Sequence, residues 1–163
     1  MLWVAASLHY FVLPPVDDLP AHADVIFELG PPIAARSELV RRLLADGRVD
    51  AALVSVPEYA RTQNPELVDE LCSTSKVTCA APEPSTTRGE ARLLARYATR
   101  EHWTSAVVVT QTAHVSRARM LMRRCFTGRL AVVASGEAPA DGWLYQAVYQ
   151  TGSTIKAWSL PGC

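Results

Sequence analysis

The most constraining feature of this sequence is an alternation of short strand-like runs with longer helical patterns. The clearest strand is the apolar run 106–109, because four consecutive apolar residues are typical of a central parallel strand covered on both faces. The clearest helix follows it, since apolar residues from Val115 to Cys125 recur at a helical spacing. Alternation of this kind favours βαβ units and a mainly parallel sheet.

The same patterns predict the rest of the fold. Further strands are expected at residues 23–29, 51–56, 76–80 and 130–134. Further helices are expected at residues 37–46, 65–71, 90–100 and 143–158, the last interrupted at Gly152. Ser37 is expected to cap the first of these helices, and Gly47 to end it. The sequence therefore predicts a Rossmann-like three-layer α/β sandwich with a mainly parallel sheet of about five strands.

The chain has the length and composition of one domain. It contains 163 residues, of which 49% are apolar and 20% are charged, and this is too much apolar material for a disordered segment. No repeat, low-complexity tract or linker divides residues 21–163, so we expect them to form a single domain. A chain of this length buries enough surface for one core without a structural metal.

Charge excludes one class of function. Sixteen basic and sixteen acidic residues cancel, so no overall field attracts nucleic acid or an anionic membrane surface. Nucleic acid is therefore not an expected partner, and any recognition of charge must be local. Fourteen of the sixteen basic residues are Arg, which suits planar, bidentate contacts with anions when it is held in a cleft.

Residues 1–20 are expected to form a separate N-terminal segment. The apolar run 1–13 is shorter than the roughly 20 residues of a spanning helix, and it has no basic region or usual cleavage site. Three interpretations stay open. The run is the end of a transmembrane anchor whose beginning is missing, a weak signal sequence, or a strand or helix packed on the domain.

The four cysteines, Cys72, Cys79, Cys125 and Cys163, have no CxxC spacing and no nearby His in a zinc pattern, so we expect no metal site. Disulfides 72–79 and 125–163 are one of three possible connectivities and would require an oxidising, extracytoplasmic location. The alternative is that Cys125 is simply a core residue on the apolar face of a helix.

Polar residues follow each of the first four predicted strands. In open parallel sheets the carboxyl ends of the strands meet at one crevice, where helix N-termini present positive ends to a ligand. Two arginines, a histidine, hydroxyls and a carboxylate at such a crevice predict a site for a phosphate or carboxylate. The candidate site residues are Gly30, Arg36, Ser55, Thr87, Glu90, Thr110, His114 and Arg117.

Some of these residues also have a purely structural interpretation. Thr87 and Glu90 match a capping box, and His114 at a helix start is consistent with a surface histidine. No P-loop lysine and no GxGxxG follow the first strand, so ordinary nucleoside triphosphate or dinucleotide binding is not supported. Ser55 lies outside any GxSxG motif, so a hydrolase elbow is not supported either.

Two runs, 86–91 and 106–119, together resemble the signature of the SanA/ElyC/YdcF family, a bacterial domain of unknown function. The resemblance spans roughly residues 24–158. It implies a Rossmann-like fold and, for many members, an N-terminal membrane anchor and a role in the cell envelope or in peptidoglycan metabolism. Other members are cytosolic and are suspected of binding nucleotide-like ligands. The positions that match in order are Gly30, Arg36, Thr87, Glu90, Thr110, His114 and Arg117.

The sequence departs from the family pattern at three places. Val56 and Pro57 follow Ser55 where the family often has two glycines, which makes a stiffer loop. Thr86 stands where Asn is common, and Gln150 where an acidic residue is common. Binding is therefore better supported than catalysis.

The residues and the resemblance together favour an envelope-associated protein that binds an anionic small molecule or a lipid-linked precursor and acts as a hydrolase or transferase. Its expected location is the plasma membrane or the extracytoplasmic space, with the cytoplasm as the alternative, and no cofactor is identified. The arginines would hold the anion and the threonines orient it. Glu90 and His114 would form an acid/base pair, since a histidine that titrates near neutrality suits proton transfer.

Two other functions stay open. A non-catalytic scaffold or sensor of the envelope would use the same crevice for binding alone. An S-adenosylmethionine-binding, methyltransferase-like enzyme would need an acidic residue after the second strand to hold the ribose. The sequence offers only Glu58 at that place.

Overall fold

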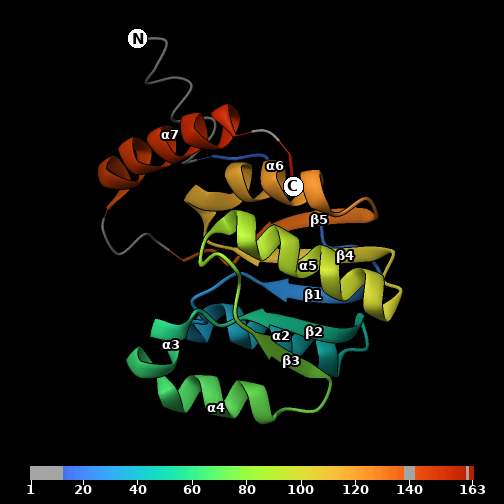
Figure 1. Cartoon of the computed structure of the whole chain (residues 1–163). Coiled ribbons are helices and arrows are strands. Elements are labelled where there is room, and N and C mark those ends of the chain that lie inside the picture. Colours follow the sequence, from blue (N-terminus) through green and yellow to red (C-terminus); the bar gives the residue numbers. More distant parts are fainter. Residues whose placement is uncertain (1–12, 138–141, 161) are drawn as a thin grey trace.

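The computed structural model describes residues 13–137, 142–160 and 162–163 (Figure 1). It confirms the predicted α/β fold, a parallel sheet of five strands flanked by helices in a Rossmann-like sandwich. The strands are β1 (Ala23–Glu28), β2 (Val49–Ser55), β3 (Val77–Ala80), β4 (Ser105–Thr110) and β5 (Arg129–Ala134). The helices are α2 (Ala34–Ala45), α3 (Glu58–Gln63), α4 (Pro65–Ser73), α5 (Thr87–Glu101), the 3₁₀ turn η2 (Thr112–His114), α6 (Val115–Cys125) and α7 (Trp143–Ser159).

The order of the strands determines where a ligand can enter. The sheet runs β3-β2-β1-β4-β5, so the chain first moves outward from β1 and then crosses back to β4. The order reverses between β1 and β4. In open parallel sheets this switch point leaves a crevice at the carboxyl ends of the two strands.

Alternating side chains of the central strands divide the core between the two faces of the sheet. Val25 and Phe27 of β1 pack with α5 and α6, whereas Ile26 packs with α2 on the other face. All six residues of β4 are buried, as its apolar run predicts.

Most boundaries differ from the sequence prediction by a few residues, and three helices differ more clearly. The helix α2 begins at Ala34, so Ser37 lies inside its first turn and does not cap it. The helix α3 was not predicted, because its six residues are mostly polar and only Ala60 is buried. The helix α7 continues through Gly152, although the sequence predicts an interruption there. Gly152 is exposed, and a Cβ atom added there would contact no other described element.

The first described residues cover the outer edge of β5. Asp17 exchanges hydrogen bonds with Val132, donating from its backbone N–H at 3.1 Å and accepting on its carboxylate at 2.8 Å. The same carboxylate pairs with Arg119 at 3.0 Å. Most of the anchor-like run, residues 1–12, lies outside the described residues. Within the described ranges, no helix is both long and apolar enough to cross a bilayer.

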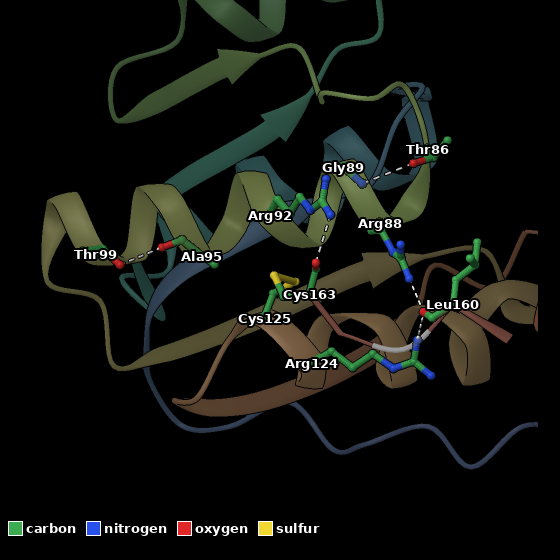
Figure 2. The surroundings of a disulfide bond; sticks show 10 residues. All are labelled: Thr86, Arg88, Gly89, Arg92, Ala95, Thr99, Arg124, Cys125, Leu160 and Cys163. Carbon is green, nitrogen blue, oxygen red and sulfur yellow. Dashed lines mark hydrogen bonds between the residues drawn. A yellow bond between two sulfur atoms is a disulfide. The ribbon is translucent and has the colours of Figure 1, made fainter. Parts of the chain in front are cut away.

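Both disulfides of one predicted connectivity are present, and all four cysteines are paired. Cys72–Cys79 joins α4 to β3. Cys125–Cys163 joins the end of α6 to the C-terminal tail, and Figure 2 shows this bond beside α5. Cys125 also packs against the main core cluster, but it is half-buried and disulfide-bonded, so the alternative that it is simply a core residue is wrong.

Candidate functional site

A cavity of about 570 Å³ lies at the carboxyl ends of the strands. Residues from the junctions after β1, β2, β3 and β4 all line it, as predicted; examples are Gly30, Tyr59, Glu90 and His114. A further wall, absent from the sequence prediction, comes from α7 and includes Gln150. The cavity therefore lies at the switch point of the sheet and is closed on one side by the last helix.

Gly30 brings two strand ends together at the base of the cavity. Its N–H donates to Glu90 Oε1 at 2.7 Å. A Cβ atom at this position would lie 2.5 Å from the Ser55 carbonyl oxygen and 2.7 Å from Pro57 Cδ. These distances are too short for any side chain, so the close approach of the two junctions requires glycine.

We expect Gly30→Ala to lower the free energy of unfolding by roughly 1–3 kcal/mol, because a carbonyl and a proline ring cannot rotate away from the added methyl group. Gly152→Ala is the matched control. Outside the local helix backbone no atom lies within 4 Å of its added Cβ, and the helix should gain up to about 1 kcal/mol. Urea unfolding of both variants measures the two effects. A Gly30→Ala variant as stable as the wild type would show that the junctions can separate without cost.

The start of α5 differs from the predicted capping box. Thr86 is the N-cap, and its hydroxyl accepts from the Gly89 N–H at 3.2 Å. Thr87 is the first helical residue, and Glu90 bonds Gly30 instead of reaching back to the cap. The capping-box interpretation is therefore wrong, because the N-cap is Thr86 and no side chain bonds back to it from Gly89. Both Thr87 and Glu90 line the cavity.

Glu90 titrates in the neutral range. Its side chain is buried, and burial raises the pKa to about 7. The Gly30 N–H, the nearby Ser55 hydroxyl and the positive charge of Arg117 favour the carboxylate form and limit this rise. Near pH 7 this carboxyl can therefore both accept and release a proton.

His114 is held between two threonines. Its Nδ1 lies 2.9 Å from Thr110 Oγ1, and its Nε2 lies 3.4 Å from Thr87 Oγ1. Burial, followed by the charges of Arg117 and Arg36, lowers the pKa of the ring well below its usual value. The expectation that this histidine titrates near neutrality is therefore wrong, and His114 is neutral there.

Arg117 reaches the cavity with uncharged partners only. Its Nη1 donates to Thr87 Oγ1 at 3.0 Å, and its Nε donates to Gln150 Oε1 at 2.9 Å. Gln150 in turn donates to Gln146 Oε1 at 3.1 Å. Burial lowers the pKa of Arg117, but a guanidinium stays charged at neutral pH. In the described part of the chain no carboxylate forms an ion pair with Arg117.

Arg36 lies behind the cavity wall. It is 6% exposed, donates from Nη1 to the Leu29 carbonyl oxygen at 2.5 Å and lies 3.4 Å from the Glu137 carboxylate. It is not among the residues that line the cavity. Its charge therefore acts on the site from a distance, lowering the pKa values of Glu90 and His114.

Ser55 and Thr110 also lie behind the wall. Both are fully buried, and neither lines the cavity. Thr110 holds His114, whereas the Ser55 hydroxyl lies near the Glu90 carboxyl and favours its charged form. Of the eight predicted site residues, the structure brings five to the cavity surface: Gly30, Thr87, Glu90, His114 and Arg117.

Sequence analysis missed a second buried carboxyl, Glu28, at the end of β1. Burial raises its pKa to about 7, although Arg36, the Ile33 N–H and the Ser37 hydroxyl favour the charged form. The sequence contained one signal of this buried carboxyl, because Glu28 is an acidic residue at the end of an otherwise apolar strand. Ser37, predicted as a cap, instead donates to this carboxyl at 3.2 Å.

No group of potential metal ligands among the described residues lines the cavity. The one such group, His22, Asp24 and Asp50, lies at the amino ends of β1 and β2, and the Asp24 carboxylate already accepts hydrogen bonds from Thr104 and Ser105. Glu58, the residue that a methyltransferase-like site would use, is exposed and does not line the cavity.

No family model, curated protein or solved structure matches this chain. Its class is therefore defined by the fold and the site alone. It is a parallel α/β protein whose switch-point cavity carries a guanidinium without a carboxylate of the described residues in direct contact and a nearby carboxyl with a pKa of about 7.

Proposed function

We propose that this chain is an envelope-associated protein, similar to the SanA/ElyC/YdcF family, that binds an anionic small molecule or the anionic part of a lipid-linked precursor in the cavity. Its anion would contact Arg117 and the first turn of α5. Both elements line the cavity, and backbone N–H groups at a helix start favour negative charge.

The observation that carries this proposal is the set of partners of Arg117. A half-buried guanidinium is normally paired with a carboxylate or another anion, because removing its charge from water is costly. Here both hydrogen-bond partners are neutral, and the nearby Glu90 carboxyl is partly protonated near pH 7. An anionic ligand would supply the missing charge.

The pKa of Glu90, about 7, supports a reaction after binding, either hydrolysis or group transfer. In its carboxylate form Glu90 would accept a proton from an attacking water or acceptor hydroxyl. The attacking oxygen would then form its bond to the electrophilic atom of the ligand, and the leaving oxygen would depart with the electron pair of the broken bond and take up a proton. His114, being neutral, would orient the Thr87 hydroxyl.

Arg117→Met is expected to weaken binding of inorganic phosphate and pyrophosphate by roughly 10- to 150-fold, because hydrogen bonds to a charged group contribute about 1.5–3 kcal/mol. Thermal stabilisation by the two anions near pH 7 measures the effect. Arg123→Met is the control, since Arg123 is an exposed residue of the same helix and does not line the cavity. Equal stabilisation of both variants would mean that the anion does not bind at Arg117.

The scaffold or sensor alternative is distinguished by Glu90. A binding protein without catalysis keeps its anion affinity in Glu90→Gln and turns over no copurifying ligand in either form. An enzyme turns over the ligand that mass spectrometry identifies, and loses this turnover in Glu90→Gln.

A further inference from the structure

The outward face of α7 is unusually apolar. Figure 1 shows α7 on the outside of the molecule, next to α6. Leu144 is 77% exposed, Val148 57% and Ile155 58%. Of the eleven large apolar side chains that are exposed in the described residues, eight belong to α7 and the residue after it. A concentration of this kind marks an interaction surface in a folded protein.

The polarity of α7 is the reverse of that of an ordinary surface helix. Its buried face carries two amides, Gln146 and Gln150, which bond each other. Gln150 also accepts from Arg117 at the cavity wall. Its outward face carries the aliphatic residues together with Tyr145, which stacks on Tyr149 at the edge of the cavity. A surface helix normally places its polar residues in water. The outward face of α7 therefore fits an apolar environment.

The charges around this face fit an anionic lipid surface. From Trp143 to Ser159 there is no acidic residue, and the one charged residue is Lys156, which borders the cavity as well as this face. Three arginines converge at the C-terminal end of the helix, as Figure 2 shows for Arg88, Arg92 and Arg124. They donate to the backbone carbonyl groups of Ala157, Leu160 and Cys163, and Arg88 also lines the cavity. In the described chain none of these three arginines pairs with a carboxylate side chain.

We propose that the outward face of α7 docks on the surface of an anionic lipid bilayer. Apolar and aromatic side chains beside basic residues are the pattern of helices that lie in the plane of such a surface. A second copy of the chain fits less well, because its α7 would bring the same cations to both sides of the contact. The proposal does not require anion binding in the cavity. Arg88, Tyr149 and Lys156 line the cavity as well, so docking would hold the cavity wall at the membrane surface.

The test compares the full-length wild type with Leu144→Ser/Val148→Ser/Ile155→Ser by sedimentation with vesicles of phosphatidylcholine and phosphatidylglycerol in equal amounts. We expect the triple variant to bind at least about tenfold more weakly, because it removes three apolar contacts. Wild-type binding should also weaken on vesicles of phosphatidylcholine alone. Circular dichroism checks that the variant is folded, and its response to phosphate tests the cavity separately.

The wild type and the triple variant share the apolar run 1–12, so its contribution to vesicle binding cancels in the comparison, and a second variant controls for the loss of exposed apolar side chains as such. Leu13→Ser/Val16→Ser removes exposed apolar side chains outside α7 and should bind vesicles like the wild type. Undiminished binding of the triple variant overturns the proposal. Self-association of the wild type that the triple variant abolishes also overturns it, because the face would then bind a second copy.

Discussion

Replacing Cys125 and Cys163 with alanine is expected to lower the free energy of unfolding by about 4 kcal/mol. This disulfide spans a sequence separation of 38, and its loss frees a long loop in the unfolded chain. The Cys72–Cys79 bond spans only 7 residues, so removing it should cost about 2.5 kcal/mol. Urea unfolding of the two double variants measures both values under the same conditions.

The two double variants should also differ in anion binding. The tail that follows α7 ties this helix to the domain, because its carbonyl groups accept hydrogen bonds from arginines of α5 and α6. The position of α7 matters for the cavity, since Gln150 of α7 accepts a hydrogen bond from Arg117. Loss of Cys125–Cys163 should therefore weaken stabilisation by phosphate, whereas loss of Cys72–Cys79 should leave it unchanged. Equal losses of stability and of phosphate binding in the two variants would contradict a special role for the tail.

The fold could be predicted because each strand has a recognisable local pattern of apolar residues. Four apolar residues in a row at 106–109 indicate a strand covered on both faces, and β4 is buried throughout. The helix α3 could not be predicted, since a six-residue polar segment carries no apolar stripe. The unbroken α7 was missed because a glycine on an exposed helical face costs only about 1 kcal/mol and does not end the helix.

The sequence predicts which strand-to-helix junctions form the site, but not which side chains contact one another within it. Parallel topology alone brings the ends of four strands together, and this explains why five of the eight predicted residues line one cavity. The cap of α5 differs from the prediction by a single residue, and that shift turns Thr87 and Glu90 from capping groups into cavity groups. The contribution of Gln150 depends on how α7 packs, which no local pattern of the sequence determines.

Burial determines which of the two groups, Glu90 or His114, titrates near neutral pH. It disfavours the charged form of each, so it raises the pKa of Glu90 and lowers that of His114. The positive charges of Arg117 and Arg36 oppose the first shift and add to the second. The carboxyl therefore titrates near neutrality, where the sequence alone favours the histidine.

Glu90→Gln is expected to make the protein more stable than the wild type at about pH 8, by up to roughly 3 kcal/mol. The pKa of this carboxyl is about 7 in the folded chain and 4.5 in the ordinary unfolded case. Between these values the folded state binds more protons, so the free energy of unfolding of the wild type falls as the pH rises. The amide introduced by the substitution does not ionise, and its oxygen can still accept from the Gly30 N–H.

Urea unfolding at several pH values from about 4 to 8 measures this difference, which should vanish below the unfolded pKa of 4.5 because both forms are then uncharged. Glu28 titrates in both proteins and cancels in the comparison. Glu66→Gln, at an exposed position of α4, is the control and should differ from the wild type by a small constant amount. If the curves of Glu90→Gln and the wild type run parallel across this range, Glu90 titrates in the folded chain as it does in the unfolded one.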